Sequence, residues 1–169
     1  GGRGYFVLDV TKPGSTDSSV SNDFTAANAN NIVVTDKTFP GSATADIDPN
    51  FADIGHIYAP AVVDTVNPFV ATQISKMNNG RWAVVMGNGY NSVNERPVLL
   101  IQYLDGAKEL LTIPVTTTSA KGDNGLSAPR LVDINGDGTP DVVYAGDLKG
   151  NLWKFDFSSD VPANWQVAF

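Results

Sequence analysis

The feature that most constrains the fold is an ordered series of short apolar segments that occurs twice. Ala59–Asp64 reads Ala-Pro-Ala-Val-Val-Asp, and 69 positions later Ala128–Asp133 reads Ala-Pro-Arg-Leu-Val-Asp. Two further apolar runs follow in each copy, the first ending in glycine and the second in aspartate: 83–87 and 99–105, then 142–146 and 152–156. Such an ordered repetition predicts a protein built from one supersecondary unit used more than once.

The repeated segments have the composition of β-strands. They are rich in Val, Ile, Tyr and Phe and are bounded by Gly, Pro, Asn or Asp, which is the pattern of strands separated by turns. Only two of the 18 acidic residues are glutamates, and aspartate favours turns over helices. The predicted strands are 5–10, 32–35, 58–63, 81–86, 98–103, 110–115, 130–133, 141–145, 151–157 and 165–169. The stretch Lys12–Asn31 is polar and is predicted to be a surface excursion.

A unit of roughly 50–70 residues made only of strands is typical of a β-propeller blade. Tyr5–Asp9 resembles the last strand of an earlier copy, so we predict an all-β, partial β-propeller of about three blades. The alternative is a β-sandwich. We expect residues 1–169 to form a single fragment of one propeller domain in a larger protein. Open sheet edges would then favour self-association, because they carry unpaired backbone groups.

Charge and composition exclude several classes of partner. The net charge of −7 and the pI of about 4.4 argue against nucleic acid, whose phosphates would be repelled. The absence of cysteine excludes disulfides and thiolate metal sites. No apolar run reaches the roughly 18 residues that a transmembrane helix needs.

One segment carries the pattern of a calcium loop. It reads Asp-Ile-Asn-Gly-Asp-Gly-Thr-Pro-Asp over 133–141, which matches the first nine positions of an EF-hand-like loop. Calcium takes about six to eight oxygen ligands, and glycine at the sixth position permits the tight coil that brings them together. The predicted Ca²⁺ ligands are the side chains of Asp133, Asn135, Asp137 and Asp141 and the backbone carbonyl of Thr139.

This loop departs from an EF-hand in two ways. Tyr144 stands where the bidentate glutamate would be, and both flanks are predicted strands rather than helices. We therefore predict a calcium loop within a β-hairpin. The alternative is a metal-free turn rich in Asp, Asn and Gly, although three carboxylates within nine residues would repel one another without a cation.

Other candidate residues have structural interpretations. His56 is the sole histidine, and a histidine beside isoleucines is more often structural than catalytic. Trp82, Trp153 and Trp165 could form a carbohydrate-binding surface, but aromatic residues in sheet repeats more often pack between sheets. No Ser/His/Asp triad or carboxylate pair stands out, so the sequence favours a protein that is not an enzyme.

Three stretches resemble a known family. The sequence 144–156, Tyr-Ala-Gly-Asp-Leu-Lys-Gly-Asn-Leu-Trp-Lys-Phe-Asp, follows the 133–141 loop directly and is similar to the signature of the PilC/PilY-type type IV pilus tip proteins. Gly1–Thr11 and Arg81–Tyr90 resemble two further stretches of the same domain. The resemblance runs, with gaps, from residue 1 to about residue 157.

The resemblance implies a modified, quinoprotein-like β-propeller that binds Ca²⁺ through the same five residues. It also implies an extracellular protein at the pilus tip or outer-membrane surface, which supports pilus assembly against retraction, twitching motility and adhesion. The implied partners are other pilus tip components (minor pilins) and host or abiotic surfaces. Some family members carry an Arg-Gly-Asp tripeptide for cell binding, but here Arg3-Gly4 is followed by Tyr5, so integrin binding is not expected.

Two other function classes share some of these features. FG-GAP (integrin-like) and lectin-like propellers also use such hairpin loops, but usually in several blades. The equivalent position in the first copy, Asp64-Thr-Val-Asn-Pro68, lacks the pattern, which favours the pilus family. A quinoprotein dehydrogenase would need its calcium in a cofactor pocket at the propeller axis, and nothing in the sequence places the loop there.

Overall fold

The computed structural model describes residues 3–11, 24–38, 49–58, 64–67, 72–116 and 122–169. Within these ranges the regular elements are ten β-strands, one four-residue α-helix and three short 3₁₀ helices. The expected all-β class is therefore confirmed. The predicted strand at 58–63 falls almost entirely outside the described residues.

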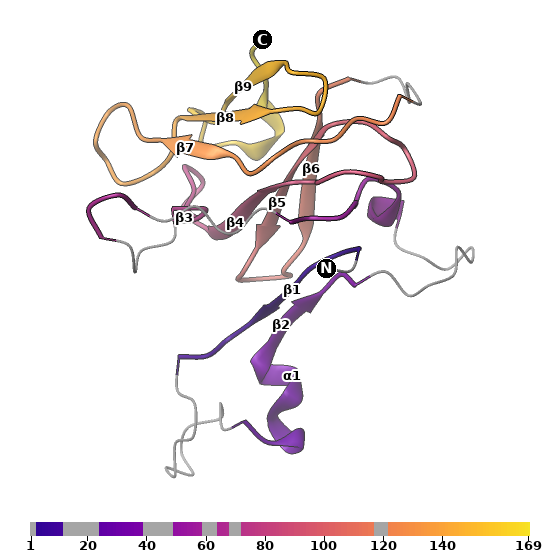
Figure 1. Cartoon of the computed structure of the whole chain (residues 1–169). Helices are drawn as coiled ribbons and strands as arrows, with labels where there is room; N and C mark the ends of the chain where they lie inside the picture. Colours follow the sequence, from indigo (N-terminus) through magenta and orange to yellow (C-terminus); the bar gives the residue numbers. More distant parts are fainter. Residues whose placement is uncertain (1–2, 12–23, 39–48, 59–63, 68–71, 117–121) are drawn as a thin grey trace.

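Most of the strands belong to two antiparallel four-stranded sheets, which lie above one another in Figure 1. The first sheet contains β3 (Ile74–Lys76), β4 (Trp82–Gly87), β5 (Val98–Tyr103) and β6 (Leu110–Pro114). The second contains β7 (Arg130–Val132), β8 (Val142–Gly146), β9 (Leu152–Asp156) and β10 (Gln166–Val167). In both sheets strands that are neighbours in sequence pair with each other, in the orders β3-β4-β5-β6 and β10-β9-β8-β7.

The repeat seen in the sequence appears in the register of these sheets. Gly87 at the end of β4 pairs with Leu99 of β5, and Gly146 at the end of β8 pairs with Leu152 of β9. The strand β3 was not predicted. Its three residues, Ile-Ser-Lys, are too few and too polar to give a strand signal. Pairing with β4 stabilises the extended conformation that the local sequence alone does not favour.

The main hydrophobic core lies between the two sheets. The first sheet contributes buried side chains that include Val85, Leu99 and Ile101, and the second contributes Val143 and Phe155. A smaller core around Ile54, Val98 and Leu100 covers the other face of the first sheet. All six residues of β5 are consequently buried, as its continuous run of apolar residues favours.

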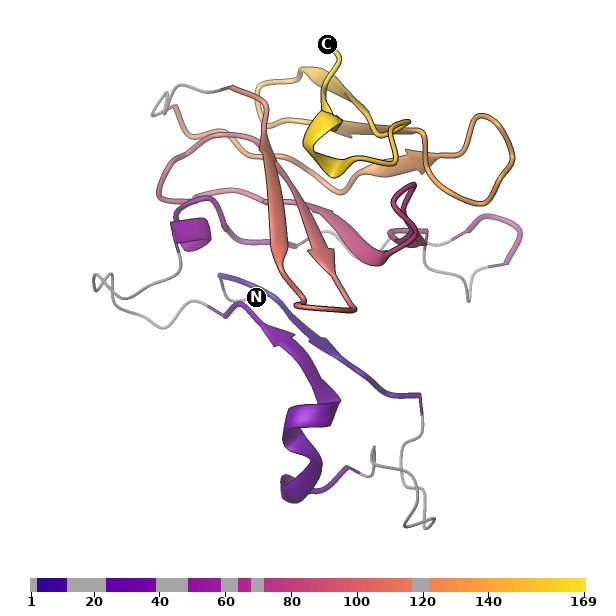
Figure 2. The same ribbon diagram turned by 180° about the vertical axis from the view of Figure 1, so that it is seen from behind.

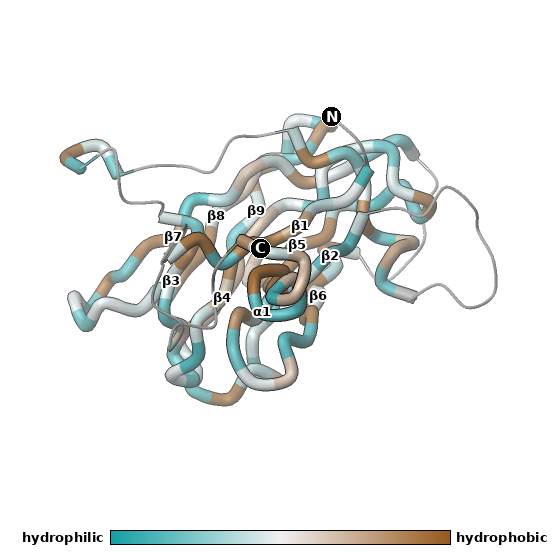
Figure 3. The backbone as a smooth tube through the Cα atoms, turned by 90° about the horizontal axis from the view of Figure 1, so that it is seen from below, coloured by the Kyte–Doolittle hydropathy of each residue, from teal (hydrophilic) through white to brown (hydrophobic). Residues whose placement is uncertain are grey.

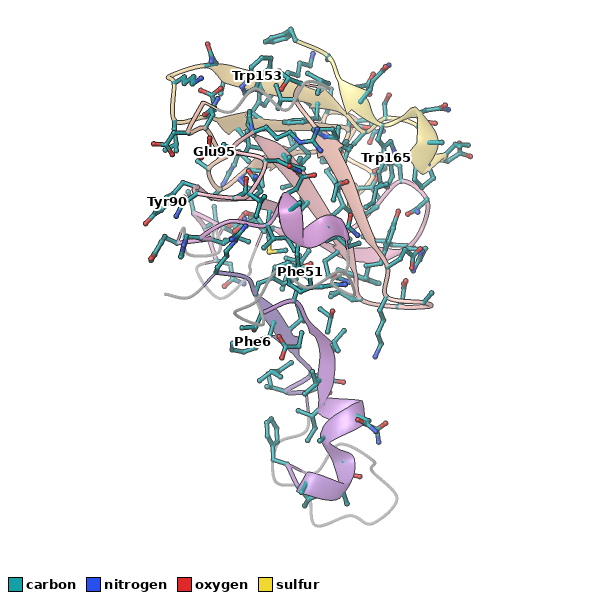
Figure 4. All side chains as sticks on the ribbon, turned by 90° about the vertical axis from the view of Figure 1, so that its right-hand side faces the viewer. Phe6, Phe51, Tyr90, Glu95, Trp153 and Trp165 are labelled. Carbon is teal, nitrogen blue, oxygen red and sulfur yellow. The ribbon has the colours of Figure 1, made fainter. Side chains whose placement is uncertain are left out.

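A two-stranded hairpin projects from the sheets, and Figures 1 and 2 show it below them from both sides. It consists of β1 (Phe6–Leu8) and β2 (Val33–Asp36). The short helix α1 (Ala29–Ile32) lies between them in the chain, directly before β2. The α1 turn lies at the end of the stretch predicted to be irregular. The Tyr5 hydroxyl donates to Oε1 of the buried Gln102 (2.7 Å) and ties the hairpin to the first sheet. Figure 4 shows Phe6, which is 64% exposed, on this projecting part.

Hydrophilic and hydrophobic residues alternate along much of the chain, as Figure 3 shows by colour. This alternation is typical of antiparallel sheets with one face in a core and one toward solvent. In the part of the chain that the structure describes, no helix has the length and apolar character needed to span a bilayer.

Candidate functional site

The segment 133–141 is the connection between β7 and β8, at the left of Figure 1. Val132 pairs with Val142 at its base, and the Asp141 N–H donates to the Val132 carbonyl (2.9 Å). The two ends of the loop are thus joined by the antiparallel pair of β7 and β8. This is the β-hairpin setting expected from the sequence, and its flanks are not the helices of an EF-hand.

Asp133 organises the first half of the loop. Its Oδ1 accepts a hydrogen bond from the Gly136 N–H (2.7 Å) and its Oδ2 accepts one from the Gly138 N–H (2.8 Å). Gly136 and Gly138 have φ values of 80° and 89°, in the left-handed region that favours glycine. The two glycines therefore permit the coil that brings their N–H groups onto one carboxylate.

The middle of the loop is held by hydrogen bonds between residues two positions apart in sequence. Asn135 Oδ1 accepts from the Asp137 N–H (2.9 Å), and Asp137 Oδ1 accepts from both the N–H and the hydroxyl of Thr139 (2.8 and 2.6 Å). The hydrogen bond from the Thr139 side chain, followed by that from its backbone N–H, lowers the pKa of the exposed Asp137 carboxyl. Asp137 is therefore fully ionised near neutral pH.

Asp141 closes the loop from its buried end. Asp141 is buried, and its Oδ2 accepts from the N–H groups of Ile134 (2.8 Å) and Asn135 (3.2 Å). These bonds fold the start of the loop back onto its end. The structure thus brings Asp133, Asn135, Asp137 and Asp141 into one hydrogen-bonded loop.

The donor set has the chemistry that calcium prefers, since carboxylate, amide and carbonyl oxygens are hard ligands. In the described ranges, however, no three acidic, histidine or cysteine side chains gather as a metal cluster by themselves. The carboxylates hold backbone N–H groups, and the two Asp133 oxygens, which accept one hydrogen bond each, keep a second lone pair for a further partner. A cation here would need the Asn135 amide oxygen and the Thr139 carbonyl as well as carboxylates.

Asn78 is a contact residue that the sequence did not reveal. It lies in the turn between β3 and β4, in the other sheet, yet its Nδ2 donates to the carbonyls of Pro140 (2.9 Å) and Phe157 (2.8 Å). Its Oδ1 is 2.7 Å from the Thr139 hydroxyl. The dipeptide Asn-Asn followed by glycine predicts only a turn, so no local signal pointed to this long-range contact.

The remaining candidates have structural surroundings. His56 stacks with Tyr58 and Tyr90 at ring separations of 6.0 and 5.5 Å. Trp165 is buried against Phe157 at 4.8 Å, and the Trp153 indole donates to Asp147 (2.9 Å). Figure 4 shows both tryptophans in the second sheet and its connections. Trp82 differs, because 51% of it is exposed.

Comparison with known proteins gives a consistent result. Residues 1–165 match the PilY1 beta-propeller domain family. An 89-residue stretch is 48% identical to the type IV pilus biogenesis factor PilY1 of Pseudomonas aeruginosa strain PAO1, over 52% of this chain and 8% of that protein. The protein of the same name from strain UCBPP-PA14 is 36% identical over 157 residues, 92% of this chain and 10% of that protein.

A relative from Xylella fastidiosa, a type IV pilus biogenesis factor PilY1 homolog, is 33% identical over the full chain and 10% of its own length. The crystal structure of the Pseudomonas aeruginosa PilY1 C-terminal domain superposes with a TM-score of 0.65 at 30% identity, over 99% of this chain and 30% of that one. The chain thus spans about a tenth of the length of these curated relatives. The expected partial β-propeller is confirmed.

Proposed function

We propose that this chain, which belongs to the PilY1 β-propeller domain family, is part of a type IV pilus biogenesis factor and acts without catalysing a reaction. The observation that carries the proposal is the family match over residues 1–165, together with relatives named as pilus biogenesis factors over 92% or more of the chain. We also propose that residues 1–169 form one continuous fragment of a single propeller domain. Burial of side chains from both four-stranded sheets in a common core supports this.

The finer parts of the role are extensions of the same proposal. The protein would lie outside the cell, at the pilus tip or the outer-membrane surface, in contact with minor pilins and with host or abiotic surfaces. There it would support pilus assembly against retraction, twitching motility and adhesion. The acidic surface, with a net charge of −7, suits a partner with basic groups.

Calcium is the proposed regulator of this module. Asp133, Asn135, Asp137 and Asp141 would hold the ion through side-chain oxygens, and Thr139 through its carbonyl. When bound, the ion would neutralise the carboxylates crowded into the β7–β8 loop. The hydrogen bonds within the loop and the two glycines with positive φ support the proposal, because they fix the loop before any ion arrives.

Calorimetric titration with CaCl₂ tests the metal site. The wild-type chain is expected to bind one ion, and Asp133→Ala to weaken binding by more than about 100-fold, since a charged ligand is lost. Asp64→Ala is the matched control, because Asp64 occupies the equivalent position in the first copy, and it should bind as the wild type does. Equal binding by all three proteins, or binding by none, would contradict the site.

The pilus role is tested in cells. The region corresponding to this chain is deleted from the chromosomal copy of the full-length protein in its own bacterium, and surface pili and twitching zones are measured. We expect loss of surface pili, with recovery when retraction is also disabled. Normal piliation in the deletion strain would count against a role in assembly.

A further inference from the structure

One hydroxyl group in the β7–β8 loop faces two acceptors. Thr139 Oγ1 lies 2.6 Å from Asp137 Oδ1 and 2.7 Å from Asn78 Oδ1. A threonine hydroxyl has a single proton to donate. It can therefore satisfy only one of these two acceptors at a time.

The Asn78 oxygen cannot supply the missing proton. Its amide nitrogen donates both of its N–H groups, to the carbonyls of Pro140 and Phe157 at 2.9 and 2.8 Å. Exchanging the amide oxygen and nitrogen would place an oxygen against two carbonyl oxygens, which is unfavourable. The Asn78 oxygen is thus fixed as an acceptor, and among the residues that the structure describes its donor is the Thr139 hydroxyl.

The two acceptors belong to different parts of the molecule. Asp137 is a candidate calcium ligand in the loop, whereas Asn78 belongs to the turn between β3 and β4 of the other sheet. A carboxylate attracts a hydroxyl proton more strongly than a neutral amide oxygen does. With the loop free of cation, the proton therefore goes to Asp137, and the contact with Asn78 lacks its hydrogen bond.

We propose that the Thr139 hydroxyl is a two-position switch that joins calcium binding in the 133–141 loop to the contact between the two sheets. It donates to Asp137 when the loop is free of calcium, and to Asn78 when the ion engages the Asp137 carboxylate. This rests on the calcium site proposed above. Asn78 is a positioning residue in this scheme: it does not touch the ion, but it stabilises the calcium-bound arrangement of Thr139.

A double-mutant cycle tests the switch, with the calcium dissociation constant as the readout. Asn78→Ala is expected to weaken binding roughly 2- to 10-fold, the equivalent of one net hydrogen bond, because Thr139 then has no second acceptor. In the Thr139→Val background the same Asn78→Ala change is expected to alter affinity less than about 2-fold. Thr139→Ser keeps the hydroxyl and should retain the full effect of Asn78→Ala.

The results distinguish failure of the proposed Thr139 switch from failure of the proposed calcium site. If wild type does not bind calcium, both proposals are wrong. If wild type binds but Asn78→Ala weakens binding equally with and without the Thr139 hydroxyl, Asn78 has only a structural role and the switch is wrong.

A second readout does not depend on the Asn78→Ala variant folding. The side-chain amide protons of Asn78 should exchange with solvent more slowly when calcium is added to wild type or to Thr139→Ser. They should show no such calcium effect in Thr139→Val. A calcium effect of the same size in Thr139→Val would overturn the proposal.

Discussion

Asp64 and Asp133 stand at the same position of the two sequence copies, yet they organise turns of different kinds. Asp64 Oδ1 accepts from the N–H groups of Val66 and Asn67, both at 2.8 Å, and so caps a short turn. Asp133 uses both oxygens to hold N–H groups three and five residues ahead. The shared aspartate is therefore a capping residue of the repeat. What distinguishes the second copy is the spacing of oxygen side chains and glycines after it.

A second pair of equivalent positions follows the strands β4 and β8. Asn88 comes after Gly87, and Asp147 comes after Gly146. Asn88 is fully buried and uses its amide in both directions, donating to the carbonyls of Asp53 and Arg96 and accepting from the N–H groups of Val98 and Leu126. Asp147 only accepts. A neutral side chain thus serves where donors and acceptors must both be satisfied, and a carboxylate where only donors surround it.

The largest expected effect comes from removing the neutral member of this pair. Asn88→Ala should lower the free energy of unfolding by about 3–5 kcal/mol, because it leaves the buried N–H groups of Val98 and Leu126 without their acceptor. Urea denaturation measures the loss. Ser158→Ala, which removes an exposed side chain, serves as the control and should cost little. A loss in unfolding free energy below about 1 kcal/mol for Asn88→Ala would show that the Asn88 side chain is not needed to satisfy these buried groups.

The charged member should make stability depend on pH. Burial raises the pKa of Asp147, but hydrogen bonds from Asn151, Trp153 and Asn124 outweigh it and lower the pKa to about 2. An unfolded aspartate has a pKa of about 3.9. The stabilisation by the ionised group is therefore complete above about pH 4 and is lost as the pH falls toward 2.

Urea denaturation between pH 2 and 5 measures this contribution. Asp147→Asn should flatten the profile in that range, because the titrating group is gone. Val161→Ala, at an exposed residue with no ionisable group, should leave the shape of the profile unchanged. Parallel profiles for wild type and Asp147→Asn would contradict the expected ionisation.

The smallest expected effect lies at Arg81, the residue immediately before β4. Arg81 forms ion pairs with Glu109 and with Asp105, the latter at 2.8 Å, and its guanidinium lies 3.8 Å from the centre of the Tyr103 ring. Because the Glu109 carboxylate is about half exposed, Glu109→Gln should cost less than about 1 kcal/mol in thermal or urea unfolding. Arg81→Ala should cost more, since the ring contact and both ion pairs are lost together. Equal costs for the two variants would place all the stabilisation in the Glu109 pair.

The strands with strong apolar runs could be predicted from sequence, and the short ones could not. The sequence predicts β5 with the bounds that the structure has, because its six residues form a largely apolar run between turn-forming segments. β3 and α1 were missed, since three and four residues carry too little periodicity for a local pattern to appear. Their formation depends on pairing and packing with distant parts of the chain.

The candidate loop was predictable for the same local reason, and its anchor was not. The oxygen residues and glycines of 133–141 form a contiguous motif, so their hydrogen-bonded proximity follows from sequence. Asn78 reaches this loop across 61 positions of sequence, and only the packing of the two sheets brings it there. Calcium binding itself stays a prediction.

The complete burial of β5 limits where this protein can meet anything else. Five of its side chains face one of two cores, with Val85 and Phe155 among their surroundings on one side and Ile54 on the other. The sixth, Gln102, is buried and hydrogen-bonded. A strand with no outward face cannot present chemical information to a partner, and its sequence is free to vary only within the volume of the core. A partner must therefore contact other parts of the molecule: the connections, the projecting hairpin, or exposed side chains of other strands such as Trp82 of β4.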